Sequence, residues 1–336
     1  MQLPHDIERI VTHNDFDGIV SAALLSKALG CDSFLFTGPG AVSNSTVTIG
    51  IRDAVCDLPY PLECGLWFDH HAGNLDVVKL RGIDPETIPG RFDTKPSCAR
   101  VILGHLTGLG LALPGFYEET VAETDTIDSF DYRSVEEWRR ETPGKLVDMS
   151  LKARVGTRSD HFDYLDYLAG RVRDNPLAAI AAEDEVLARI REYRGEEEKM
   201  SALLKDGASF LEGDRNGELV VVDLTHHKRE PRVQRNLAYI LHPGALGAAV
   251  LSPVFRGGTK TNDISVSISL SMNMTGREHA KDMGEIMRLL NIGDGHPGAA
   301  AGTVHCDSKD AMLRAKKKLL ADIWRIWASM DPGKPA

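Results

Sequence analysis

Short apolar runs alternate with amphipathic stretches over the first 130 residues of the chain. The apolar runs have the length and composition of strands, and the longer stretches have the spacing of helices. Such alternation predicts an α/β domain with a largely parallel sheet. Strands are predicted at Ile7–Thr12, Ser33–Thr37, Ala54–Leu58 and Gly65–Phe68, and helices at Ile19–Leu29, Ser97–Leu106 and Gly115–Ala122.

The pattern changes in the middle of the chain, where residues 176–212 form a helical run of mixed charge that is typical of a solvated connector. A second α/β pattern follows. Its predicted strands are Glu218–Leu224, Ala248–Val254 and Asp263–Met272, and its predicted helices are Val233–Leu241, Ala280–Leu290 and Lys309–Ala328. We therefore predict an N-terminal parallel-sheet domain at 1–190, a helical linker at 191–214 and a smaller C-terminal α/β domain at 215–330.

Composition narrows the class of protein. With 42% hydrophobic and 26% charged residues, the chain has the make-up of a globular protein. No apolar run approaches the roughly 20 residues that span a bilayer, and the first residues lack the features of a signal peptide. The 5 cysteines are dispersed, which favours reduced thiols and a cytoplasmic location.

The formal net charge of −10 disfavours a protein that coats long nucleic acids through a broad basic face. It leaves short phosphorylated substrates open, since a few local cations or metal ions are enough to hold them. The charge therefore limits the size of the substrate more than its chemistry.

Metal-competent side chains cluster directly after predicted strands. His13, Asp15 and Asp17 follow the first strand, Asp57 lies at the end of another, and Asp69-His70-His71 closes a further one. Ligands of parallel sheets gather beyond the carboxyl ends of the strands, so we expect these side chains to converge. Gathered carboxylates require a neutralising cation, and a mixture with imidazole favours Mn²⁺, Fe²⁺ or Zn²⁺. Two such ions bridged by a carboxylate are a common device for phosphoester hydrolysis.

Each piece also has a structural explanation when it is taken alone. Asp15 and Asp17 suit an acidic turn that caps the helix at Ile19, and Asp57 suits a turn before Leu-Pro. The pair His226-His227 is typical of an exposed surface. The ordered occurrence of the first three pieces at strand ends is what favours the metal site.

The stretch Gly-Asp-Gly-His-Pro-Gly-Ala-Ala-Ala-Gly at 293–302 is an independent candidate in the second half. Glycines beside a lone histidine let backbone amides approach an anion. The alternative is a flexible loop, although the apolar residues that follow favour an ordered one.

Together, His13-x-Asp15-x-Asp17-Gly18, Asp57, Asp69-His70-His71 and the glycine-rich stretch around His296 resemble the DHH superfamily of phosphoesterases. This superfamily includes RecJ-like, nanoRNase and exopolyphosphatase-related proteins. The resemblance covers essentially the whole chain, with a DHH domain first and a DHH-associated domain second.

The resemblance implies two Mn²⁺ ions, with Mg²⁺, Fe²⁺ or Co²⁺ as alternatives. His13 and Asp15 would bind one ion, Asp17, His70 and a further carboxylate would bind the other, and Asp57 would bridge them. That further carboxylate best matches Asp125, with Asp128 as the alternative. Asp69 would orient a histidine and His71 would face the scissile phosphate. The substrate contacts implied in the second domain are Gly293, Gly295, His296 and Gly298.

The function implied is a Mn²⁺-dependent phosphoesterase that uses a two-metal hydroxide mechanism. Its substrates would be short oligonucleotides or small nucleotides, such as 3′-phosphoadenosine 5′-phosphate or a cyclic dinucleotide. Inorganic polyphosphate is the alternative substrate, and a non-catalytic nucleotide-binding protein is the alternative from another class. No membrane partner is expected, and a homodimer is left open.

Overall fold

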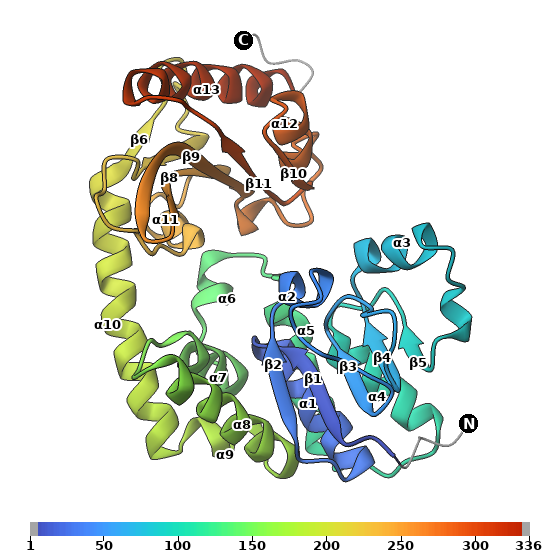
Figure 1. Cartoon of the computed structure of the whole chain (residues 1–336). Helices are drawn as coiled ribbons and strands as arrows, with labels where there is room; N and C mark the ends of the chain where they lie inside the picture. Colours follow the sequence, from blue (N-terminus) through green and yellow to red (C-terminus); the bar gives the residue numbers. More distant parts are fainter. Residues whose placement is uncertain (1–5, 331–336) are drawn as a thin grey trace. The chain divides into compact units, whose positions relative to one another are not determined.

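The computed structural model describes residues 6–330, and the chain divides into two compact units (Figure 1). The first unit contains Met1–Asp131 and Glu141–Arg194, and the second contains Tyr132–Arg140 and Gly195–Ala336. The second unit therefore combines a short segment from the middle of the chain with the C-terminal residues.

A parallel five-stranded sheet in the order β2-β1-β3-β4-β5 forms the centre of the first unit. This sheet confirms the predicted fold class. The strands are β1 (Arg9–His13), β2 (Phe34–Thr37), β3 (Asp53–Cys56), β4 (Leu66–Asp69) and β5 (Gly90–Phe92). The last of them was not predicted, because its exposed Arg91 and its glycine give no apolar pattern.

Helices cover both faces of this sheet. Successive strand residues point to opposite faces, so each strand contributes to two apolar cores. Ile10 and Phe68 pack into the larger apolar core, whereas Val11 and Trp67 pack into a smaller one on the other face. The helices of this unit are α1 (Phe16–Leu29), α2 (Pro39–Ser43), α3 (Ala72–Leu80), α4 (Cys98–Gly108), α5 (Phe116–Asp128), α7 (Pro143–Lys152), α8 (Arg158–Asp174) and α9 (Leu177–Ala181), with a 3₁₀ turn η1 (Pro85–Thr87). Residues 57–65 between β3 and β4 contain no helix, in contrast to the usual crossover between parallel strands.

A mixed sheet in the order β10-β11-β9-β8-β7-β6 forms the second unit. Its strands are β6 (Ala208–Phe210), β7 (Leu219–Asp223), β8 (Gly247–Arg256), β9 (Thr259–Leu270), β10 (Gly293–His296) and β11 (Ala299–Val304), and its helices are α6 (Val135–Arg139), α11 (Ala238–Leu241), α12 (Met283–Leu289) and α13 (Lys309–Ser329), with 3₁₀ turns η2 (Arg235–Leu237) and η3 (Met272–Met274). Among the described strands of this sheet, β7 and β8 pair in parallel and the other neighbours are antiparallel.

The prediction of a loop at 293–302 is wrong, because these residues form the antiparallel hairpin β10–β11. Small side chains carry no apolar alternation, so the sequence pattern does not reveal the strands. Glycines allow close packing around the hairpin. A Cβ on Gly293 would lie 2.0 Å from the carbonyl oxygen of Ala301. A Cβ on Gly284 of the neighbouring helix α12 would lie 2.3 Å from the carbonyl oxygen of Gly295.

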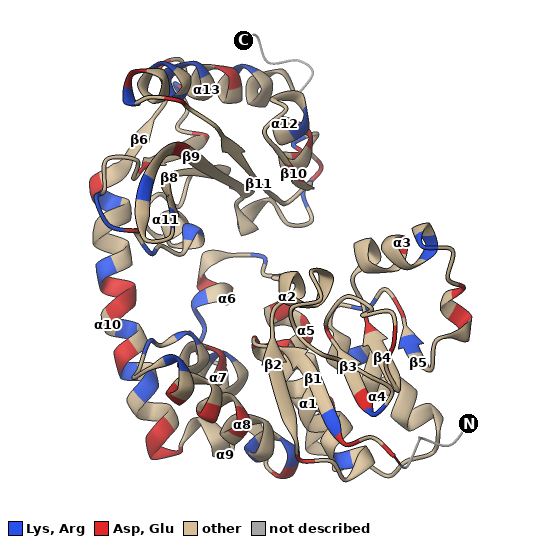
Figure 2. Cartoon of the chain, in the orientation of Figure 1, with Lys and Arg blue, Asp and Glu red and all other residues tan. Residues whose placement is uncertain are grey.

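The long helix α10 (Asp184–Gly207) occupies most of the predicted connector, and basic and acidic residues are interspersed along it (Figure 2). Among residues 6–330, no helix combines the length and the apolar character needed to cross a membrane.

Gly18 allows a close approach between the first turn of α1 and the end of β1. A Cβ at this position would lie 2.1 Å from the carbonyl oxygen of His13. We expect Gly18→Ala to reduce the free energy of unfolding by about 1–3 kcal/mol, since the backbone must move to relieve the overlap. Gly104→Ala is the matched control, because Gly104 lies within helix α4 and a Cβ there meets nothing within 4 Å.

Chemical denaturation of both variants measures the difference. The control should be unchanged or more stable by up to about 1 kcal/mol, as expected for alanine in a helix. Equal stability of Gly18→Ala and the wild type would contradict the close approach.

Candidate metal centre and active site

Three adjacent strands deliver the predicted residues to one edge of the first sheet. His13 is the last residue of β1, Asp57 follows β3, and Asp69 is the last residue of β4. Because β1, β3 and β4 are neighbours and run in parallel, their carboxyl ends meet at the same edge.

Asp15 and Asp17 lie at the start of α1 and have structural roles in addition to their place in the cluster. Asp15 is the N-cap, and its Oδ1 accepts a hydrogen bond from the backbone N–H of Gly18 at 3.0 Å. The buried Asp17 accepts from the backbone N–H groups of Cys98 at 2.7 Å and Ala99 at 2.9 Å, at the N-terminus of α4. The predicted helix cap is therefore present, and it coexists with the cluster.

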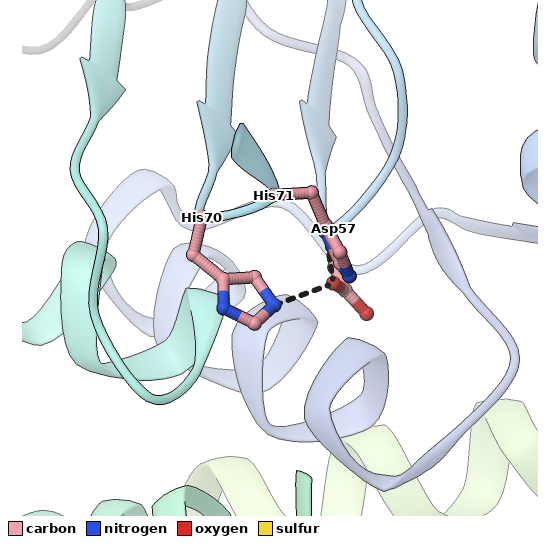
Figure 3. A group of neighbouring side chains, drawn as sticks. All are labelled: Asp57, His70 and His71. Atoms are coloured by element: carbon pink, nitrogen blue, oxygen red, sulfur yellow. Dashed lines mark ion pairs between the residues drawn. The ribbon is translucent and has the colours of Figure 1, made fainter. Parts of the chain in front are cut away.

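Asp57 lies between the histidines. Its φ of 56° is left-handed, a conformation that few residues other than glycine adopt and that recurs at functional sites. The Asp57 Oδ2 atom is 3.6 Å from His13 Nδ1. The Oδ1 atom is 3.6 Å from His70 Nε2 and 3.8 Å from His71 Nδ1 (Figure 3). One carboxylate thus presents its two oxygens to two different sets of side chains.

A backbone carbonyl fixes the orientation of the His70 ring. The Nδ1–H group donates to the carbonyl oxygen of Lys95 at 3.0 Å, which leaves Nε2 directed into the cluster. The Nε2 atom is 3.4 Å from Asp128 Oδ2 and 3.7 Å from Asp17 Oδ2. Lys95 was not predicted as part of the site, because a contact through a backbone carbonyl has no characteristic residue type.

The donor atoms fit a divalent cation. Asp57 Oδ1 and His70 Nε2 are buried and have no hydrogen-bond partner among the described residues. Their separation is too long for a hydrogen bond. Ligand bonds of about 2.0–2.2 Å place neighbouring ligand atoms about 3–3.5 Å apart, close to the distances seen here. Three overlapping groups of this kind occur: His13, Asp15 and Asp57; Asp17, His70 and Asp128; and Asp57, His70 and His71.

The pKa shifts of the cluster show how strongly it attracts positive charge. Burial lowers the pKa of His13, but Asp15 and Asp57 outweigh this effect and raise it to about 10. Burial also lowers the pKa of His70, but the surrounding carboxylates outweigh this effect and raise it to about 10. Burial, followed by the charge of Asp57, raises the pKa of Asp128 to about 6 and that of Asp17 well above its usual value. Without a cation, the cluster therefore retains protons at neutral pH.

Asp69 differs from the other carboxylates because its hydrogen bonds are nearly saturated. This fully buried side chain accepts from the backbone N–H of His70 at 2.8 Å, from His71 Nδ1 at 2.8 Å and from Asn74 Nδ2 at 2.7 Å. Asp69 thus holds the His71 ring with its Nδ1 edge inward, while the side chain of His71 stays 51% exposed. The sequence did not single out Asn74, which lies in the first turn of α3.

The structure separates Asp125 from Asp128, although both lie on α5. Asp125 accepts from Ser97 Oγ at 2.6 Å and Arg100 Nε at 2.8 Å, and it is in none of the three groups. Asp128 lies one turn further along and joins Asp17 and His70. The geometry therefore favours the alternative residue.

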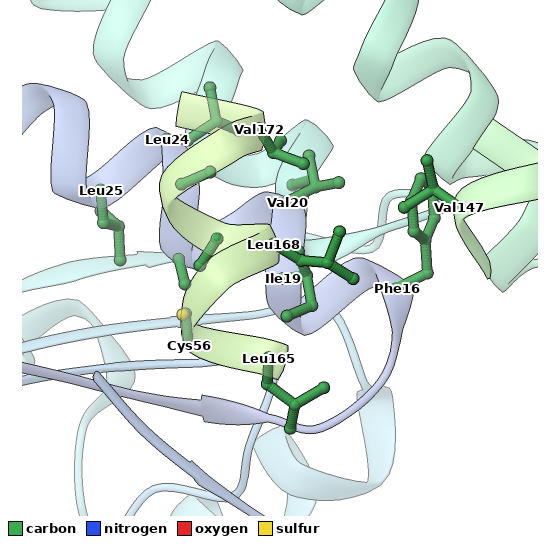
Figure 4. Packing of buried hydrophobic residues seen from close by; sticks show 14 of the residues in the cluster. Phe16, Ile19, Val20, Leu24, Leu25, Cys56, Val147, Leu165, Leu168 and Val172 are labelled. Atoms are coloured by element: carbon green, nitrogen blue, oxygen red, sulfur yellow. The ribbon is translucent and has the colours of Figure 1, made fainter. Parts of the chain in front are cut away.

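An apolar core lies behind the cluster and holds its elements in place. Phe16, Ile19 and Val20 of α1 belong to the same buried cluster as Cys56 of β3 and Leu168 of α8 (Figure 4). Because α1 is buried along most of its length, the turn that carries Asp15 and Asp17 has little freedom to move.

The predicted substrate contacts lie in the second unit. Gly293, Gly295 and His296 are in β10, whose residues are all exposed, and Gly298 is in the hairpin turn. The backbone N–H of Gly298 donates to His296 Nδ1 at 3.2 Å, so the neutral ring carries its proton on Nε2.

Comparison with known proteins identifies the fold. No family model and no curated protein matches the chain. Among solved structures, the pGpG-specific phosphodiesterase PggH from Vibrio cholerae matches 95% of this chain and 99% of its own, with a TM-score of 0.70 and 24% identity. RecJ from Thermus thermophilus, solved in complex with Mn²⁺, matches 96% of this chain and 52% of its own, with a TM-score of 0.54 and 16% identity. The expected resemblance is confirmed at the level of the fold, which this chain shares with PggH and RecJ.

Mn²⁺ binding should distinguish the two aspartates of α5, Asp125 and Asp128. We expect Asp128→Asn to weaken Mn²⁺ binding at least about tenfold, because it removes a charged oxygen from the group with Asp17 and His70. Asp125→Asn should instead lower the melting temperature, since it breaks the contacts with Ser97 and Arg100.

Mn²⁺ titration calorimetry and thermal melts of both variants provide the measurement. If Asp125→Asn weakened Mn²⁺ binding more than Asp128→Asn, the assignment drawn from the geometry would be wrong.

Proposed function

We propose that the protein is a metal-dependent phosphodiesterase that hydrolyses short phosphorylated substrates. The observation that carries this proposal is the pair of buried atoms, Asp57 Oδ1 and His70 Nε2, that have no hydrogen-bond partner among the described residues and lie within a cluster of carboxylates and imidazoles. An interior polar atom without a partner costs free energy, and a bound cation would remove that cost.

The ligand groups suit two ions of the Mn²⁺ class. His13 and Asp15 would hold one, Asp17, His70 and Asp128 would hold the other, and the two oxygens of Asp57 would reach both. When bound, such ions would activate water and neutralise charge on a phosphate. The RecJ structure contains Mn²⁺, which supports manganese as the first ion to test.

His71 would serve as the proton donor. Its hydrogen bond with Asp69 is the main cause of its raised pKa, so the ring holds its proton more firmly than a free histidine does. With Nδ1 engaged, Nε2–H is the group that would donate to a phosphate oxygen or to the leaving group. Asp69 and Asn74 would act by fixing the position of this ring.

A linear dinucleotide is the first substrate to test. PggH, which shares the fold across nearly the whole of this chain, is described as specific for pGpG. The acidic net charge of −10 also favours a short substrate over a long polyanion.

Loss of the shared carboxylate should abolish turnover. We expect Asp57→Asn to reduce kcat on pGpG with Mn²⁺ by at least about 10³-fold, because both ion sites lose a charged oxygen. The matched control is Asp53→Asn at the opposite end of the same strand, where Asp53 pairs with Arg9 at 2.8 Å. This control should lose stability while its kcat stays within about threefold of the wild type.

The assay should include pGpG, 3′-phosphoadenosine 5′-phosphate, cyclic di-AMP and polyphosphate, each with Mn²⁺ and with EDTA. Hydrolysis of polyphosphate alone would favour an exopolyphosphatase. The absence of Mn²⁺-dependent turnover on every compound would refute the enzymatic proposal and favour a binding protein.

Metal binding should release protons. In the metal-free protein His13 and His70, with pKa values of about 10, are protonated at pH 7, and a metal requires their neutral forms. The apparent affinity for Mn²⁺ should therefore fall as the pH falls, by about tenfold per pH unit for each proton released. Calorimetry at pH 6.5, 7.5 and 8.5 in buffers of different ionisation enthalpy counts these protons. An affinity independent of pH would show that Mn²⁺ binds elsewhere.

A further inference from the structure

A short segment, residues 93–96, lies at the same edge of the first sheet as the metal-competent cluster. It follows β5, and β5 runs parallel to its neighbour β4, so both strands end at that edge. Phe92 of β5 pairs with Asp69 of β4, which is the residue before His70. Residues 94–96 are all exposed. The segment therefore borders the cluster on the side of His70 and faces solvent.

The backbone of Lys95 is fixed against the cluster, whereas its side chain is only loosely held. Its carbonyl oxygen accepts the hydrogen bond from His70 Nδ1 at 3.0 Å. Its side chain is 48% exposed, and Nζ lies 3.7 Å from Asp93 Oδ2, which Arg91 Nη2 also approaches at 3.4 Å. Exposed ion pairs of this length contribute little to stability, so the ammonium group can leave Asp93 for a stronger anion.

The charge balance of the cluster creates a need for a further cation once a substrate binds. The charge of two divalent ions would be neutralised by the carboxylates of the cluster, which are Asp15, Asp17, Asp57 and Asp128. A phosphodiester brings one more negative charge, and the attack of hydroxide adds negative charge in the transition state. A positive group beside the phosphate would therefore stabilise both the bound substrate and the transition state.

Two basic residues flank the start of helix α4, and they differ in how firmly they are paired. Arg100, in the first turn, donates to Asp125 at 2.8 Å and to Glu118 at 2.6 Å, so its charge is already balanced within the protein. The ion pair of Lys95 with Asp93 is longer, at 3.7 Å, and is exposed. An ammonium group on a flexible four-carbon stem is a compact point charge that suits a phosphate oxygen. Of the two residues, Lys95 is therefore the one that a ligand can recruit.

We propose that the ammonium group of Lys95 binds a non-bridging oxygen of the substrate phosphate at the metal centre. Lys95 is then a substrate-binding residue of the first unit, whose side chain acts on the substrate while its backbone orients His70. The inference rests on the proposed function, because that function supplies the phosphodiester.

Lys95→Gln tests the side chain alone, because the backbone carbonyl that orients His70 remains in place. The affinity for Mn²⁺ and the melting temperature should stay at their wild-type values. In calorimetric titration, the Mn²⁺-loaded variant should bind sulfate, a soluble tetrahedral oxyanion that mimics phosphate, at least about tenfold more weakly than the wild type. This is the effect of losing one charge-assisted contact. Lys95→Arg keeps the charge and should restore most of this affinity.

The same variants should differ in turnover. We expect Lys95→Gln to lower kcat/KM on pGpG by about 10–100-fold and Lys95→Arg to recover most of it. Arg91→Gln is the matched control, since it also removes one positive charge and one contact with Asp93, but Arg91 lies within β5 rather than in the bordering segment. The kcat/KM and the sulfate affinity of this control should stay within about threefold of the wild type.

Wild-type levels of hydrolysis and sulfate binding in Lys95→Gln would overturn this inference and leave the proposed function standing. Mn²⁺ binding weakened as much as turnover would also overturn it, because Lys95 would then act only through His70. Conversely, Mn²⁺-dependent sulfate binding that requires Lys95, without hydrolysis of any compound, would support this site and refute the proposed function. Wild-type protein that neither binds sulfate nor hydrolyses any compound would overturn both.

Discussion

Electrostatic repulsion at one edge of the first sheet is the constraint on which the rest of this unit depends. Asp57 lies near His13 together with Asp15, and near His70 together with Asp17 and Asp128. Asp17 and Asp57 are buried. The fold opposes this repulsion with fixed dipoles, such as the N-terminus of α4 at Asp17. It also packs α1, which carries two of the carboxylates, into the centre of the core. An added cation would balance the negative charge that the backbone dipoles do not offset.

The residues around the cluster divide into those that face its centre and those that position them. The distinction follows from hydrogen-bond capacity. Asp57 and His70 each have a buried atom with no hydrogen bond to any described residue, whereas Asp69 and Asp125 accept hydrogen bonds from neighbouring donors. Aspartates in and beside the cluster thereby acquire different chemistry. Asp15 does both, because one oxygen caps α1 while the other faces His13 at 2.6 Å.

The sequence predicted the parts of this structure that depend on regular periodicity. Apolar runs identified four of the five strands of the first sheet, and the residues at their carboxyl ends came together because parallel strands bring them there. Asp125 and Asp128 could not be separated in the same way, since they lie on one helix and only tertiary contacts distinguish them. The hairpin at β10 and β11 was missed because glycine and alanine have no apolar alternation.

The short segment Tyr132–Arg140 has a consequence for how the molecule is built. The chain leaves the first unit after Asp131, returns at Glu141 and leaves again after Arg194, so neither unit is one continuous stretch. Within the second unit, Arg139 pairs with Glu197 at 2.8 Å, which ties the segment to residues synthesised later. During translation α6 must therefore wait for its partners, a non-local step of the kind that slows folding. A fragment that starts at Gly195 would lack this segment, and one that ends at Arg194 would carry it without the residues it contacts.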